Sequence, residues 1–276
     1  MWPVILKFDA PDQKGKCHFS AGGARRFRLM NVQNKSAKVC VAILFFMVLA
    51  EPISAEQLSI GTEDVNAYPL FGHEKGAFTG FAGALFEAFS NQTGHTIVVK
   101  AFPIKQLPSA VVQEQIQLTF PDNPHWSVSE KKGQRILYSL PVLSYKEGVL
   151  ILPSHKGKPI QRMGVLEGLY AWEYKKDIEA GRIELVFAKS SASLIKLVLD
   201  EKVDGAYFNV AIAKQILKSK YGNENLLMFN QALPYSADFY YLSTIQKPEI
   251  VSQFNQFLTK NHELVKRLKQ QFSLAP

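Results

Sequence analysis

The sequence predicts an α/β fold with mainly parallel sheets, and the alternation of two kinds of segment carries that prediction. Short runs rich in Val, Ile, Leu and aromatic residues alternate with stretches of helical periodicity from residue 58 to the end of the chain. Such alternation is typical of chains in which helices connect parallel strands and cover the faces of the sheet. The sequence also contains no internal repeat and no low-complexity segment.

The expected strands are the runs richest in β-branched, leucine and aromatic residues. In chain order they are 58–61, 96–101, 136–139, 148–152, 162–165, 183–188, 205–208 and 239–245. The expected helices between them are 83–92, 107–115, 169–179, 191–202 and 210–221. In the helix 191–202, Leu194 lies one turn from Val198 and Ile195 one turn from Leu199, which predicts an apolar stripe on one face.

Two further helices are expected near the C-terminus, each with an apolar side. The first begins at Pro248, because a first turn leaves its N–H groups unpaired and proline has none to lose. Asn261 is expected to cap the second.

No flexible linker divides the chain into domains. The expected strands 148–152 and 239–245 are instead predicted to be a pair of crossings between two lobes. One lobe then comprises residues 56–147 plus 246–276, and the other comprises residues 148–245.

Residues 30–55 have the three-part pattern of a secretory signal peptide. Two lysines precede twelve apolar residues (39–50), and a short polar break leads to Ala55. Twelve apolar residues are too few to span a bilayer. We therefore expect cleavage after Ala55 and export to the periplasm, with residues 1–29 as an upstream extension. A buried core helix is the alternative.

The chain has 32 Lys and Arg against 24 Asp and Glu, a formal net charge of +8. Eight of these basic residues and three of the acidic ones lie in residues 1–55, so this segment carries +5 of the total. The remainder is close to neutral and gives no argument for nucleic-acid binding. Both cysteines, Cys17 and Cys40, also precede residue 56, so the exported part has no thiol for a disulfide, a metal site or a nucleophile.

Five short motifs carry a resemblance to a known family. They are LSIGTEDVNAYPLF (58–71), FTGFAGALFEAF (78–89), SEKKGQRILYSLPV (129–142), RMGVLEG (162–168) and LDEKVDGAYFNVAIA (199–213). Their order and spacing resemble those of the bacterial extracellular solute-binding proteins of family 3. The resemblance covers essentially all of residues 56–276.

The resemblance implies a two-lobed periplasmic-binding-protein-like fold of type II, with a ligand cleft between the lobes. It implies a receptor that captures a small polar solute, an amino acid or a derivative, for the membrane permease of an ABC importer. The alternative is a ligand-sensing module of a membrane signalling protein. In either role we expect a monomer that is not an enzyme, with no cofactor and no nucleic-acid partner.

The family binds a ligand carboxylate with an arginine before an aromatic-serine motif, and a ligand amine with an aspartate at the second lobe's crossing. Aligned on Tyr138 and Ser139, the arginine position holds Lys132, with Arg135 three residues further on. The aspartate position holds Asn209, and an amide cannot neutralise an ammonium group. These departures count against a standard α-amino acid as the ligand.

The segment FPDNPHW (120–126) takes the place of the family's ligand-binding loop. Asp122 offers a carboxylate, Asn123 an amide and Trp126 a flat ring, and two prolines reduce the entropy lost when the loop is ordered. The alternative is a rigid surface turn in which Trp126 covers the core.

Two tyrosines complete the set of candidate ligand-binding residues. Tyr68 lies in the aromatic-proline loop of the first motif, and Tyr170 follows Gly168 at an expected helix start. The alternative for each ring is packing in a core. The histidines are scattered without the spacing of metal ligands, so no metal site is expected.

Overall fold

The protein is described by a computed structural model that covers residues 55–74 and 77–274. The expected signal peptide, apart from Ala55, therefore lies outside the described residues. Within these ranges no helix combines the length and the apolar character needed to cross a membrane.

Strands and helices alternate along the described chain. The strands are β1 (Gln57–Glu63), β2 (Gly72–Glu74), β3 (Ala77–Thr79), β4 (Thr96–Phe102), β5 (Leu118–Asp122), β6 (Leu137–Tyr138), β7 (Leu143–Ile151), β8 (Arg162–Leu166), β9 (Glu184–Ala188), β10 (Gly205–Asn209), β11 (Met228–Phe229) and β12 (Tyr235–Thr244). The α-helices are α2 (Gly80–Thr93), α3 (Leu107–Val112), α4 (Lys175–Glu179), α5 (Ser191–Leu199), α6 (Val210–Tyr221), α7 (Pro248–Lys260) and α8 (His262–Gln271). Two 3₁₀ helices are η2 (Pro153–His155) and η3 (Trp172–Tyr174).

One mixed sheet runs through these elements, in the order β4-β1-β5-β12-β7-β10-β8-β9. β1 is parallel to β4 and β5, and β8 is parallel to β9 and β10. The two central strands, β7 and β12, are antiparallel to each other, from Gly148 opposite Tyr235 to Leu143 opposite Tyr240. The expected parallel pairing is therefore present in the outer strands, whereas the centre of the sheet is antiparallel.

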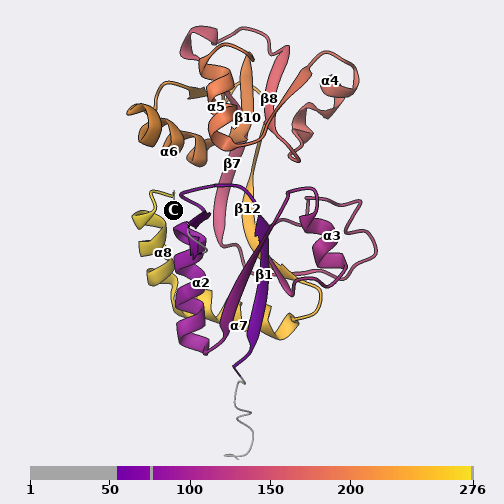
Figure 1. Cartoon of the computed structure of the whole chain (residues 1–276), viewed down its shortest axis with the longest axis vertical. Helices are drawn as coiled ribbons and strands as arrows, with labels where there is room; N and C mark the ends of the chain where they lie inside the picture. The colour runs from indigo at the N-terminus through magenta and orange to yellow at the C-terminus, as the bar shows by residue number, and fades with distance from the viewer. Residues whose placement is uncertain (1–54, 75–76, 275–276) are drawn as a thin grey trace, which may run out of the picture. The chain divides into compact units, whose positions relative to one another are not determined.

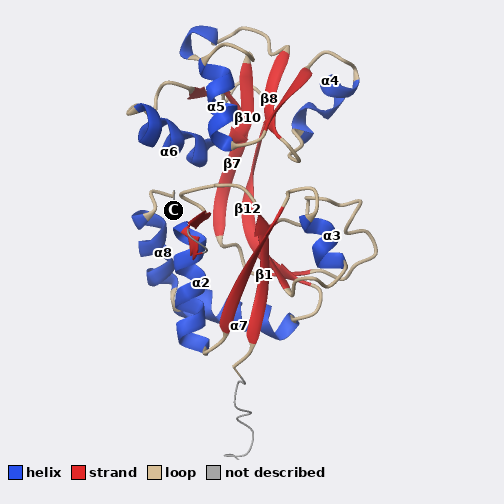
Figure 2. Cartoon of the chain, in the orientation of Figure 1, coloured by secondary structure: helices blue, strands red, loops and turns tan. Residues whose placement is uncertain are grey.

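The central strands join two lobes. In Figure 1, β1 lies with α2, α3, α7 and α8 in the first lobe, and β8 and β10 lie with α4, α5 and α6 in the second. Figure 2 shows β7 and β12 as the long strands that pass from one lobe to the other. The boundaries expected at 147/148 and 245/246 stay a prediction, and β7 itself extends across the first of them.

Each lobe has an apolar core formed by helix faces against the sheet. In the first lobe, Phe89 of α2 packs edge-to-face on Phe254 of α7, with ring centroids 5.2 Å apart. In the second lobe, Leu194, Ile195 and Val198 of α5 are fully buried. Leu199, the fourth residue of the predicted stripe, is partly buried against this core, so the stripe is confirmed.

Three local expectations are wrong. The segment 120–126 begins inside strand β5 rather than as a loop, because all five residues of β5 are buried between β1 and β12. The expected helix 169–179 is a 3₁₀ turn followed by the short α4. Asn261 stands before α8, but its side chain donates to Gln92 and to the carbonyl oxygen of Phe257 instead of capping the helix.

Candidate functional site

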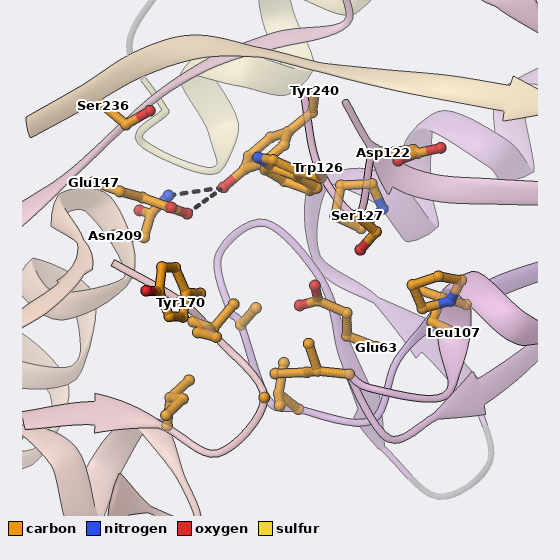
Figure 3. A pocket seen from close by; sticks show the side chains of 18 of the residues that line it. Glu63, Leu107, Asp122, Trp126, Ser127, Glu147, Tyr170, Asn209, Ser236 and Tyr240 are labelled. Carbon is orange, nitrogen blue, oxygen red and sulfur yellow. Dashed lines mark hydrogen bonds between the residues drawn. The ribbon is translucent and has the colours of Figure 1, made fainter. Parts of the chain in front are cut away.

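A cavity of about 310 Å³ lies between the lobes, and Figure 3 shows the side chains around it. Both lobes and both central strands contribute to its walls. The lobes also touch at its edge, where the Ser191 hydroxyl donates to the carbonyl oxygen of Asn66 at 3.2 Å. Gly168 has a φ of +97° and lies so near Ile104 that an added Cβ would come within 2.9 Å of that side chain. A glycine is therefore required at this contact.

Asp122 lies at the end of β5 in a buried polar network. Its carboxylate accepts a hydrogen bond from the Lys131 ammonium at 2.5 Å, from the Ser243 hydroxyl at 2.5 Å and from the backbone N–H of Asn123 at 2.7 Å. Lys131 also donates to the carbonyl oxygen of Asn123 and to the hydroxyl of Tyr138. A carboxylate with three donors, one of which is a lysine ammonium, has its charge balanced by the chain itself.

Trp126 covers one wall of the cavity and belongs at the same time to an aromatic cluster. Its ring lies 5.7 Å from the rings of Tyr145 and Tyr240, on β7 and β12. Those two tyrosine rings stack 4.5 Å apart. The two interpretations of Trp126, ligand surface and core cover, are therefore compatible.

Asn209 ends β10 and caps helix α6. Its side-chain oxygen accepts hydrogen bonds from the backbone N–H groups of Ala211 and Ile212, at 3.0 and 3.2 Å. Its amide nitrogen donates to the Tyr240 hydroxyl at 2.9 Å, which in turn donates to Glu147 at 3.5 Å. Asn209 thus orients Tyr240 and, through it, Glu147 (Figure 3).

Tyr170 lines the cavity beside Trp172, with the two ring centroids 4.5 Å apart. Glu173 follows in the same segment and accepts a hydrogen bond from the Tyr207 hydroxyl at 2.6 Å. The burial of Tyr207 and this hydrogen bond raise the pKa of the tyrosine. The second lobe therefore presents aromatic rings and a further carboxylate.

Two glutamates that line the cavity have strongly perturbed acidity. Burial, and then the charge of Asp122, raise the pKa of Glu63 at the end of β1 to about 7. Burial, and then the charges of Glu63 and Glu173, raise the pKa of Glu147 on β7 to about 8. Sequence reasoning missed both, although each stands where a predicted strand meets the expected cleft. Among the described residues there is no cluster of three His, Cys, Asp or Glu that could hold a metal.

Four of the eight residues predicted from the sequence line this cavity: Asp122, Trp126, Tyr170 and Asn209. The other four do not. Their side chains face elsewhere: Tyr68 packs on Phe272, Asn123 bonds to Asp238 and to the carbonyl oxygen of Phe239, and Lys132 and Arg135 are exposed. Lys131, one position before the expected lysine, is the cation that reaches the cavity.

No protein-family model matches the chain, and no curated protein matches its sequence. Solved structures do match its fold. A substrate-binding protein of an ABC uptake transporter from Streptococcus pneumoniae, with bound histidine, superposes with a TM-score of 0.64 at 15% identity, over 78% of this chain and 92% of that one. A histidine kinase sensor domain with similarity to periplasmic binding proteins gives 0.63 at 15% identity, over 80% and 98%.

A third match is an ancestral amino acid-binding protein described as a precursor of cyclohexadienyl dehydratase. It gives a TM-score of 0.60 at 14% identity, over 78% of this chain and 95% of that one. At such identities the likeness shows the fold alone. The chain has the type II periplasmic-binding-protein fold, and its cavity lies between the two lobes of that fold.

Proposed function

We propose that this protein is a periplasmic solute receptor related to the solute-binding proteins of family 3. It binds a small polar solute, an amino acid or an amino-acid derivative, in the cavity between its lobes. It then presents the closed complex to the membrane permease of an ABC importer. The chain itself is non-catalytic in this role.

The observation that carries the proposal is the cavity itself. Its volume of about 310 Å³ and its walls from both lobes suit a small solute that is enclosed when the lobes come together. A few polar groups, set among the apolar and aromatic side chains of Trp126, Tyr170 and Tyr240, are what a specific small-molecule site requires.

A thermal-shift screen of the purified protein tests the proposal. The panel contains amino acids, amines, organic acids and small sugars. A solute present at a hundred times its dissociation constant adds about 2.7 kcal/mol to the free energy of unfolding. We expect at least one class to raise the melting temperature by roughly 5 °C or more, as that energy implies for a chain of this size. A panel without any shift would contradict the proposal.

The alternative role is a sensor module, supported by the kinase sensor domain among the structures with this fold. Solute binding is common to both roles, but the membrane partner differs. Reconstitution with an ABC permease should stimulate its ATPase in the presence of the solute. Copurification with a signalling protein, without such stimulation, would favour the alternative.

A further inference from the structure

The charged groups around the cavity are almost all acidic. The described residues that line it include the carboxylates of Glu63, Asp122, Glu130, Glu147 and Glu173, against the single amine of Lys131. No arginine is found among these lining residues. The lysine is held by Asp122 at 2.5 Å. The cavity therefore offers no unpaired cation to a carboxylate or phosphate group of a solute.

Glu63 has its carboxylate in the cavity without a donor from any described residue. Figure 3 shows it pointing into the cavity, and its side chain makes no hydrogen bond within the described residues. It is partly buried, so it has lost much of its water without gaining a protein partner. The raised pKa of Glu63, about 7, expresses this cost. A positively charged group in the cavity would remove it.

Glu147 is the second carboxylate in the cavity that has no paired cation among the described residues. The donor bonded closest to it, the Tyr240 hydroxyl, stands at 3.5 Å, which is the limit of a hydrogen bond. Burial is the main cause that raises its pKa, and the acidic groups that face it, Glu63 on β1 and Glu173 in η3, raise it further. The side chains of Tyr240 and Asn209 lower the pKa by less. Glu147 and Glu63 enter the cavity from different strands and stand apart across it (Figure 3).

Aromatic side chains occupy the walls around the two carboxylates. Trp126 and Tyr240 lie together on one wall, and Tyr170 lies on another (Figure 3). Aromatic faces attract organic cations and also cover the carbon chain between two charges. The site thus combines two separated anionic points with an aromatic lining.

We propose that the solute is an organic cation without a carboxylate, of the class of linear alkyl diamines, whose two ammonium groups are bound by Glu63 and Glu147. This inference rests on the proposed function and narrows its solute class to amino-acid derivatives that lack the carboxylate. An α-amino acid would bring a carboxylate into a cavity whose described lining already includes five acidic residues. A diamine fits the charge pattern because it supplies two cations and no anion.

Two pairs of probes isolate the effect of the carboxylate. 1,5-Diaminopentane differs from L-lysine only by the carboxylate, and 1,4-diaminobutane differs from L-ornithine in the same way. In isothermal titration calorimetry with the full chain, each diamine should bind at least about tenfold more tightly than its amino acid, or about 1.4 kcal/mol. Equal or tighter binding of the amino acids would overturn the inference and leave the proposed function intact. If none of the four binds, the inference is overturned as well, and the wider solute screen then decides the proposed function separately.

Variants locate the bound amines. Glu63→Gln and Glu147→Gln should each weaken diamine binding about tenfold or more, because an amide keeps the shape and removes the charge. Glu87→Gln is the matched control, since Glu87 is exposed on α2 and does not line the cavity. Its affinity should equal that of the parent. Unchanged affinity in both cavity variants, with melting curves that show a folded protein, would overturn the assignment.

Wild-type titrations in buffers of different ionisation enthalpy give an independent readout. Near neutral pH, binding of a diamine should release protons from Glu63 and Glu147, so the observed heat should vary with the buffer. Heats that do not depend on the buffer would contradict the role of these two carboxylates.

Discussion

Asp122 and Glu147 are both carboxylates on the wall of one cavity, yet their hydrogen-bond and charge partners differ. Asp122 is paired with Lys131 and receives two further hydrogen bonds. Glu147 has one long hydrogen bond and acidic neighbours. A buried charge that the chain neutralises contributes to the structure, whereas one that it leaves without a cation is open to a ligand. The comparison therefore separates a structural carboxylate from candidate binding carboxylates.

The largest expected effect is a loss of stability when Asp122, the structural carboxylate, loses its cation. Lys131→Met leaves Asp122 buried without its cation, and the free energy of unfolding should fall by about 3–5 kcal/mol. Chemical denaturation measures the change. The double variant Lys131→Met, Asp122→Asn should recover a large part of the loss. A single variant as stable as the parent would show that Asp122 does not depend on Lys131.

Trp126 both packs in an aromatic cluster and lines the cavity, so its removal should change two quantities, the free energy of unfolding and the affinity for the solute. Trp126→Ala should lower the free energy of unfolding by about 2–3 kcal/mol, since the ring packs on Tyr145 and Tyr240 but is only partly buried. It should also weaken solute binding in the molecules that remain folded. Melting curves and calorimetric titration measure the two effects separately. A loss of stability with unchanged affinity would leave Trp126 with the structural role alone.

Glu147→Gln should stabilise the free protein, in contrast to Lys131→Met. The pKa of Glu147 is raised to about 8 from 4.5, so the folded state favours the protonated carboxyl. Its contribution to stability is present below about pH 4.5 and is lost as the pH rises to about 8. Glutamine mimics the protonated form, so the variant should match the parent near pH 5 and exceed it by on the order of 2 kcal/mol near pH 8.5. Melting temperatures across this range provide the test, and a variant less stable than the parent at high pH would reverse the assignment.

The smallest expected effect is at Asn209, which caps helix α6 and bonds to Tyr240 and, through it, to Glu147. Asn209→Ala removes the cap of α6 and should cost about 1 kcal/mol of stability. Asn209→Asp retains the capping oxygen but adds a negative charge beside Tyr240 and loses the donor to its hydroxyl. We expect the aspartate variant to keep more of the stability in thermal melts. Equal losses in the two variants would show that the cap is not the source of the effect.

The alternation of strands and helices predicted the α/β class, because each element carries its own periodicity. The two-lobed type II fold was predicted from the resemblance of the short motifs to a known family. The antiparallel pairing of β7 with β12 could not be predicted in that way, since strand direction depends on contacts distant in sequence. Buried strand β5 was missed because PDN marks a turn in the local sequence, although β1 and β12 bury its residues on both sides. Local signals therefore predicted where strands and helices lie better than they predicted which strands pair with one another.

The candidate site was predicted only in part. Alignment on short motifs placed the cation at Lys132, but the irregular chain between β5 and β6 turns Lys131 inward and leaves its neighbour exposed. Glu63 and Glu147 carry no local mark of function: Glu63 ends β1, and Glu147 directly precedes the run 148–152 that was predicted as a strand, and glutamates at such positions usually face solvent. Their role depends on which groups the folded chain places opposite them, and the local sequence does not determine that.

The most direct test of the binding carboxylates is a crystal structure of the protein with 1,5-diaminopentane. The account predicts the diamine in the cavity between the lobes, with one nitrogen about 3 Å from a carboxylate oxygen of Glu147 and the other at a similar distance from Glu63. Asp122 should still be paired with Lys131 in that complex. A diamine bound at Asp122 in place of Lys131, or a cavity that remains without the diamine at saturating concentration, would contradict the account.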